Sequence, residues 1–209
     1  MAYNDFTLEA LKEQFGLKTD EQGDYFARAT PLPVSDKLRH HLGEYVPLAI
    51  AIGTEKARSE LVITPVLLEV REQLAHAVSF FSGVEFNPDP ERGLCGVCDY
   101  LFSLSPEQLT IEAPVVTIVE AKNENLRQGI NQCVAEMVAA QVFNRARGSA
   151  IETVYGAVTT GTNWLFLRLT GSVVFVDRSE YYISQVEKIA GILVAMLREA
   201  SAQAAPANA

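Results

Sequence analysis

The sequence predicts an α/β protein in which one mixed β-sheet is flanked by helices. Short apolar segments of strand length alternate with longer segments whose apolar residues recur every three to five positions. The order along the chain is helix, three strands, helix and strand, followed by further strands and a closing helix. Because no linker rich in proline or glycine divides residues 46–200, we expect these elements to form one domain.

Length and charge limit the possible partners. A chain of 209 residues is long enough for one substantial core, or at most two small ones. Hydrophobic residues make up 48% and charged residues 21%, which excludes a disordered chain. The formal net charge of −9 argues against a surface that is basic throughout. A nucleic acid would therefore have to be held by a local cationic site or a bound metal.

The two ends of the chain are predicted to lie outside the main domain. Residues 1–45 are expected to form a helical accessory segment, with a helix from about Thr7 to Phe15, a proline-bearing loop and another short helix. Residues 201–209 are low in complexity and contain nothing to bury, so they predict a disordered tail.

The main domain is expected to begin with a helix. Gly53 and Thr54 open it, with Thr54 as the N-cap, and it continues to about Leu74. Pro65 either kinks this helix or starts a second one. Strands are then predicted wherever apolar runs are bounded by turn residues: 78–86, 97–104, 115–122, 153–158, 164–170 and 172–177. Further helices are predicted over 125–147 and 184–200.

Two ionisable residues stand at the end of the apolar strand over 115–122. Side chains alternate along a strand, so Glu120 and Lys122 point to the same face, about 7 Å apart. Asp99 lies inside the preceding strand among large apolar neighbours. Charged groups at such positions are costly to bury unless they pair with each other, a metal or a ligand.

These residues predict a metal site. If the two strands pair, Asp99 and Glu120 converge on one Mg²⁺, and the backbone carbonyl of Ala121 adds a third oxygen. Lys122 would then orient a water molecule and stabilise developing negative charge. Gln132, on the helix that follows, faces back toward the strand end.

This set of residues, in this order on these elements, resembles the PD-(D/E)XK nuclease superfamily, which has a restriction-endonuclease-like fold. The resemblance covers residues 54–158, whose predicted αβββαβ order agrees with that superfamily's core. The residue before Asp99 is Cys98 rather than proline. A literal Pro88-Asp89 pair occurs, but in a loop, and we favour Asp99 because its strand adjoins that of Glu120.

The resemblance implies a function for each residue of the set. Asp99 and Glu120 would be metal ligands, Lys122 the catalytic lysine, and Gln132 would support the site or the substrate. The superfamily often adds an acid on the first core helix. Glu60 matches best, in a segment that resembles the start of the nuclease domain of type I restriction subunits and their stand-alone relatives, whereas Glu69 and Glu55 remain rivals.

Arg145 and Arg147 end the helix over 125–147, where they complement its dipole and are candidates for contact with phosphate. The resemblance implies hydrolysis of DNA phosphodiesters by a metal-dependent deoxyribonuclease that uses Mg²⁺ or Mn²⁺, with DNA as partner and a homodimer as a plausible assembly. The alternative is a non-catalytic nuclease-fold subunit or regulator in a restriction or mobile-element system.

The three cysteines, Cys95, Cys98 and Cys133, lack the four ligands of a structural zinc site and predict buried thiols in a reducing compartment. The N-terminus lacks the pattern of a signal peptide, and no apolar run approaches the roughly 20 residues that span a bilayer. We therefore expect a cytoplasmic protein that does not enter membranes.

Overall fold

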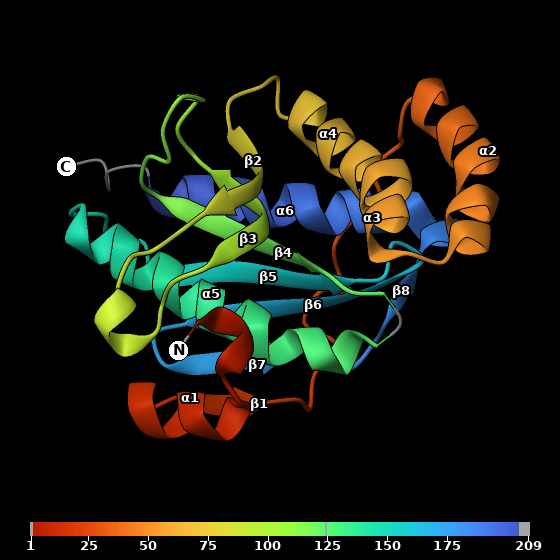
Figure 1. Cartoon of the computed structure of the whole chain (residues 1–209). Coiled ribbons are helices and arrows are strands. Elements are labelled where there is room, and N and C mark those ends of the chain that lie inside the picture. The colour runs from red at the N-terminus through yellow and green to blue at the C-terminus, as the bar shows by residue number, and fades with distance from the viewer. Residues whose placement is uncertain (1, 124, 205–209) are drawn as a thin grey trace.

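A computed structural model describes residues 2–123 and 125–204. Its centre is a mixed sheet of eight strands, in which seven follow the order β1-β7-β6-β5-β4-β3-β2 and the short β8 pairs with β6 (Figure 1). The strands are β1 (Lys18–Asp20), β2 (Ser79–Glu85), β3 (Val97–Ser103), β4 (Val115–Ala121), β5 (Thr153–Thr159), β6 (Asn163–Thr170), β7 (Val173–Val176) and β8 (Tyr181–Tyr182). The pairs β4–β5 and β1–β7 are parallel and the others antiparallel. The predicted α/β class with a mixed, helix-flanked sheet is confirmed.

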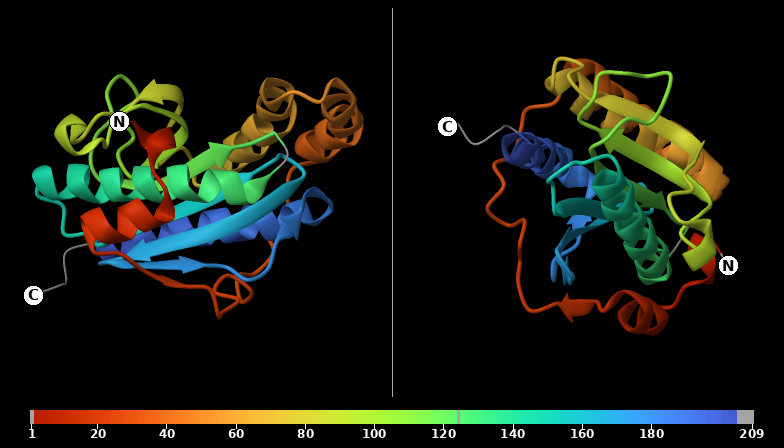
Figure 2. Two further views of the ribbon diagram at one scale, coloured as in Figure 1. Left: turned by 60° about the horizontal axis from the view of Figure 1, so that its bottom comes forward. Right: turned by 90° about the vertical axis from the view of Figure 1, so that its left-hand side faces the viewer.

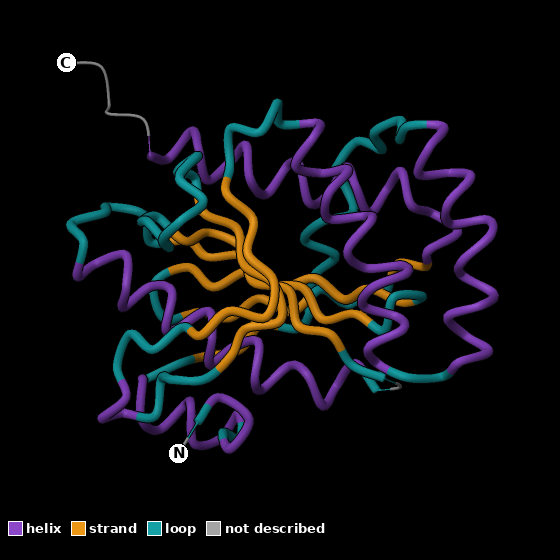
Figure 3. The backbone as a smooth tube through the Cα atoms, turned by 45° about the horizontal axis from the view of Figure 1, so that its top comes forward, coloured by secondary structure: helices purple, strands orange, loops and turns teal. Residues whose placement is uncertain are grey.

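Helices cover both faces of the sheet. The helices are α1 (Leu8–Phe15), α2 (Asp36–Ile52), α3 (Glu55–Arg58), α4 (Thr64–Gln73), α5 (Leu126–Ala146) and α6 (Val186–Ala204). Shorter helical turns lie at Tyr3–Asp5, Ser59–Ile63, Pro90–Arg92 and Ile183–Gln185. In Figure 2, α5 and α1 lie on one side of the sheet and α6 on the other, and Figure 3 shows the strands as a twisted layer between helices.

Two apolar clusters correspond to these two faces. One joins α2, α4 and α6 to side chains such as Phe102, Val119 and Trp164. The other joins α1 and α5 to side chains such as Leu101 and Ile118. Alternate residues of β3 and β4 therefore enter opposite cores, as the period of two along a strand requires.

The first core helix is continuous but irregular. α3 leads through a π-helical turn at Ser59–Ile63 into α4, which has Pro65 in its first turn. The N–H of Thr64 donates to the carbonyl of Ser59, five residues back, instead of the usual four. Proline has no N–H to continue the ladder, so the predicted irregularity takes the form of a π turn just before Pro65.

The N-terminal segment joins the main sheet. Its strand β1 pairs with β7, and α2 runs from Asp36 to Ile52, across the predicted division at residues 45 and 46. At the other end, α6 extends to Ala204, so residues 201–204 are helical rather than part of a disordered tail. The rest of that predicted tail, 205–209, lies outside the described residues. Within the part of the chain that the structure describes, no helix is long and apolar enough to cross a membrane.

Candidate active site

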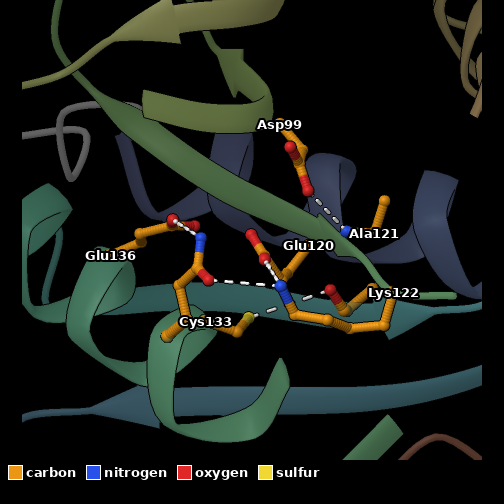
Figure 4. Close-up of polar contacts among 8 residues, drawn as sticks. Asp99, Glu120, Ala121, Lys122, Cys133 and Glu136 are labelled. Carbon is orange, nitrogen blue, oxygen red and sulfur yellow. Dashed lines mark hydrogen bonds and ion pairs between the residues drawn. The ribbon is translucent and has the colours of Figure 1, made fainter. Parts of the chain in front are cut away.

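Asp99 and Glu120 face each other where β3 and β4 separate. The last pair of the β3–β4 ladder is Tyr100 with Val119, and one further step in the same register sets Asp99 opposite Glu120. There the Asp99 side chain replaces the backbone partner, because its Oδ2 accepts from the Ala121 N–H at 2.8 Å (Figure 4). The N–H and C=O of one residue point to the same side of a strand, so the Ala121 carbonyl also faces β3. The Ala121 carbonyl therefore lies on the same edge of β4 as the Asp99 carboxylate, whereas the Glu120 side chain stands off the face of the sheet.

Lys122 connects β4 to α5 through a chain of side chains. Its Nζ donates to Oε1 of Glu120 and, at 3.2 Å, to Oε1 of Gln132. Gln132 in turn donates through Nε2 to Oε1 of Glu136 at 3.0 Å. Figure 4 shows the Lys122 amine between the strand and the helix, directed at these two oxygens. The amine is thereby held in one position.

Close packing keeps α5 against this lysine. A Cβ added to Gly129 would lie 2.5 Å from Cγ1 of Val158 and 3.0 Å from Cγ of Lys122. Such distances are far below van der Waals contact, so any larger residue at position 129 would push the first turns of α5 away from β4 and β5. Gly129 therefore lets the helix approach the stem of Lys122.

Burial makes the carboxylates of this cluster difficult to ionise. Glu120 is 1% exposed and Glu136 is 0% exposed. Burial and the adjacent Asp99 carboxylate raise the pKa of Glu120 to about 8. Burial also raises the pKa of Asp99, although the Ala121 N–H and Lys122 oppose it, and complete burial next to Glu120 raises the pKa of Glu136 well above its usual value. Burial disfavours the charged amine of Lys122, yet Glu120 and Asp99 raise its pKa overall.

Hydrogen bonds within the protein leave part of this cluster unsatisfied. Glu120 Oε2 and Glu136 Oε2 are buried and have no hydrogen-bond partner among the described residues. An unpartnered buried carboxylate oxygen is costly, and a cation beside it would remove that cost. Asp99, Glu120 and the Ala121 carbonyl are all hard oxygen donors of the kind that Mg²⁺ prefers, so the donor set fits a divalent cation. Within the described ranges, no group of three or more His, Cys, Asp and Glu side chains is arranged to hold a metal ion.

The three acids considered on the first core helix have different surroundings. Glu60 is 61% exposed and pairs with Lys56 at 2.7 Å, so the structure does not bring it to the cluster. Glu69 accepts hydrogen bonds from Ser35 and Gln73, near the start of α2. Glu55 alone of these acids acts on Glu120 and Lys122 and raises the pKa of both, after the larger effects of burial and the nearer charges. Of the rivals that spacing left open, Glu55 is therefore the one whose charge reaches the cluster.

The structure does not bring Arg145 and Arg147 to the cluster. They lie at the far end of α5, and 13 residues at 1.5 Å each separate Arg145 from Gln132 by about 20 Å. Arg145 donates to Gln141 at 3.4 Å, and Arg147 pairs with Glu112 at 3.8 Å. A position at a helix end had suggested phosphate contact, but this end faces away from the cluster.

Asp89 has a structural position. Its side chain caps a short helical turn and pairs with Arg92 at 2.6 Å. Cys98 and Cys133 are buried as predicted, and Cys95 is half-buried.

Sequence reasoning missed Glu136. It stands one turn after Gln132 within the run Val134-Ala-Glu-Met-Val-Ala-Ala140, where an acid is unexpected because the helix face is otherwise apolar. A charged residue inside an apolar run was the signal that identified Asp99, and the same signal would have found Glu136.

In comparisons with known proteins, no family model, no curated protein and no solved structure matched the chain.

Proposed function

We propose that the protein is a metal-dependent nuclease with a restriction-endonuclease-like fold that hydrolyses phosphodiester bonds in DNA. The observation that carries the proposal is the pair of half-buried Asp99 and buried Glu120, opposite each other on β3 and β4, with Lys122 held against Glu120. The sequential order α4, β2, β3, β4, α5, β5 is the order that the superfamily resemblance implies. Burial without full hydrogen bonding is the arrangement expected of a functional site rather than a surface ion pair.

Asp99, Glu120 and the Ala121 carbonyl would hold Mg²⁺ or Mn²⁺, and Glu55 would be the acid contributed by the first core helix. When bound, the metal would lower the pKa of a water molecule and neutralise charge on the phosphate. A bound cation would also reduce the repulsion between DNA and a chain of net charge −9, because it would neutralise the acids that face the substrate.

The contribution of Lys122 follows from its protonation. Its raised pKa keeps the amine charged at neutral pH, so it donates hydrogen bonds and does not act as a base. Held by Glu120 and Gln132, the amine would orient the attacking water and stabilise the negative charge that grows on the phosphate oxygens. Gln132 and Glu136 are positioning residues in this scheme, because Gln132 accepts a hydrogen bond from Lys122 and Glu136 in turn accepts one from Gln132.

The test is an assay of the purified protein on supercoiled, linear duplex and single-stranded DNA with Mg²⁺ or Mn²⁺. The protein should nick or degrade at least one of these forms. Asp99→Ala and Lys122→Ala should each lower the rate by about 10²–10³-fold. Glu69→Gln is the matched control, because it alters a buried acid outside the cluster and should leave the rate within about twofold. Unchanged activity in Asp99→Ala and Lys122→Ala would refute the assignment.

One observation favours a second function, that of a non-catalytic nuclease-fold subunit or regulator. The net charge of −9 disfavours tight binding of DNA by the isolated chain. Co-elution with a partner in size-exclusion chromatography, combined with no cleavage of any DNA form in the presence of metal, would support that alternative over the nuclease.

A further inference from the structure

A polar pocket lies beside the cluster, at the same end of the sheet. Its described lining comes from the end of α3, residues 123 and 125 between β4 and α5, the first turn of α5, the turn between β5 and β6, and Glu180. Figure 1 shows these segments together at the end of the sheet where β4 finishes. Lys122 N–H donates to the Thr159 carbonyl at 2.8 Å. The next residue after each of these two, Asn123 and Thr160, lines the pocket. The pocket therefore begins one residue beyond the lysine of the candidate site.

Two arginines enter this pocket from different elements. Arg58 comes from α3, three residues after Glu55, and Arg127 from the first turn of α5. Neither arginine pairs with an acidic side chain among the described residues. The acid in the described wall is Glu180, whose Oε2 accepts from Asn163 Nδ2 at 3.2 Å. Two positive charges and one negative charge leave the described wall positive, on a chain that carries −9 overall.

The Arg58 guanidinium is fixed but not satisfied. Its Nη1 donates to the Thr160 carbonyl at 3.1 Å, whereas its Nε is buried without a hydrogen-bond partner among the described residues. A charged planar donor with unused hydrogens suits the oxygens of a phosphate group.

The remaining polar side chains of the described wall, apart from Glu180, are uncharged. Asn123 and Asn163 contribute side-chain amides, and the Asn125 side chain caps α5 by accepting from Arg127 N at 3.0 Å. The pocket also lies at the start of a helix of 21 residues, whose dipole reinforces the two guanidinium groups toward an anion.

We propose that this pocket, formed by Arg58 and Arg127 with the amides of Asn123 and Asn163, binds a phosphate group of the nucleic-acid strand next to the phosphodiester that is cleaved. The inference rests on the proposed function, since the pocket continues the surface from Lys122. Either a phosphate at the end of a strand or one within it presents the same oxygens. The pocket supplies the local cationic site that an acidic chain requires for an anionic substrate.

The first experiment uses inorganic phosphate as the probe and does not depend on cleavage. Backbone amide signals of the intact protein are followed by NMR during a phosphate titration in EDTA. Saturable shifts should be confined to residues 123, 125–127 and 160–163, and Arg127→Ala should weaken binding about threefold to fivefold. Arg198→Ala is the matched control, because it removes the same exposed charge from α6. Shifts that are absent, spread over the surface or unchanged in Arg127→Ala would overturn the proposal.

The second experiment identifies the source of the phosphate. Fluorescence anisotropy in EDTA compares single-stranded oligonucleotides that end in 5′-phosphate or 5′-hydroxyl. If the phosphorylated strand binds more tightly and Arg127→Ala abolishes this preference, the pocket binds the phosphate at the end of a strand. Equal binding of both strands, weakened in Arg127→Ala, would assign it to an internal phosphate, and no weakening of either would contradict the proposal. If the pocket binds phosphate but the protein cleaves no DNA, the phosphate pocket stands and the nuclease activity is rejected. If DNA is cleaved and Arg127→Ala changes neither cleavage nor binding, the nuclease activity stands and the phosphate pocket is rejected.

Discussion

Glu120 and Glu69 are both buried carboxylates on core elements, yet their surroundings are opposite. Glu69, 6% exposed, accepts from Ser35 N at 2.8 Å, Ser35 Oγ at 2.7 Å and Gln73 Nε2 at 3.2 Å. Burial alone would raise the pKa of Glu69, but these donors lower it overall. Glu120 has Lys122 on one oxygen and, among the described residues, no hydrogen-bond partner on the other, and burial next to Asp99 raises its pKa.

The difference distinguishes an acid that stabilises the fold from one that is kept for chemistry. Every oxygen of Glu69 ties α4 to the start of α2, whose N-cap is Ser35. Glu120 instead carries the cost of a buried oxygen without a described hydrogen-bond partner, and a bound cation or a proton would remove that cost. A buried acid is therefore a site candidate when its hydrogen bonding is incomplete, and burial alone does not make it one.

The largest effect is expected from removing the satisfied acid. Glu69→Ala deletes the acceptor for both the backbone and side chain of Ser35, so we expect the free energy of unfolding to fall by about 2 kcal/mol. Urea denaturation measures it, with the exposed Glu60→Ala as control. If Glu69→Ala lowers the free energy of unfolding no more than Glu60→Ala does, Glu69 does not stabilise the fold through its hydrogen bonds.

A smaller effect should identify the third acid of the site. Glu55→Gln is expected to lower the metal-dependent cleavage rate about tenfold, because Glu55 is the acid of the first core helix that acts on Glu120 and Lys122. Glu60→Gln, one turn away and paired with Lys56, should change the rate less than about twofold. The reverse order of these rates would return the assignment to Glu60.

Neutralising the unsatisfied acid should stabilise the metal-free protein. Above pH 8, where the Glu120 carboxylate is ionised, Glu120→Gln removes a buried charge beside Asp99 and is expected to add about 1 kcal/mol, a rise in Tm of about 2–4 °C. The wild type, but not this variant, should gain stability from added Mg²⁺, because only a protein that binds the ion in its native state is stabilised by it. Thermal unfolding in EDTA and in Mg²⁺ measures both effects, and equal metal-induced shifts in the two proteins would contradict the account.

The smallest effect is a pH dependence confined to the satisfied acid. The folded-state pKa of Glu69 is lowered, so its contribution to stability is complete above the unfolded pKa of about 4.3 and is lost as pH falls through the folded value. The stability difference between wild type and Glu69→Gln should therefore shrink on acidification. A series of urea denaturations from neutral to acidic pH checks this, and a constant difference would show that the ionised form is not preferred.

Most of the fold could be predicted because its core elements have strong local patterns. The residues of β4 and β5 are all buried, which gives continuous apolar runs, and α5 presents the period of a helix. The strand β1 could not be predicted, because Lys-Thr-Asp is polar and becomes a strand only by pairing with β7. Its place in the sheet depends on a contact between residues about 155 positions apart in the chain.

The site was predictable only where the strand period orders the side chains. Asp99, Glu120 and Lys122 follow from alternation and pairing, and the structure brings them together with Gln132. The choice between Glu55, Glu60 and Glu69 was out of reach, since the π turn at Ser59–Ile63 shifts the helical phase between them. Arg145 and Arg147 were misplaced because a residue type at a helix end carries no information on which way that end faces.

A crystal structure of the protein soaked in Mn²⁺ tests the central claim most directly. Manganese scatters anomalously, so its position can be assigned without reference to coordination geometry. The account predicts an anomalous peak between the carboxylates of Asp99 and Glu120, with the Ala121 carbonyl as a further ligand. Carboxylates that still bind only Lys122 and the Ala121 N–H, with no peak at saturating Mn²⁺, would contradict it.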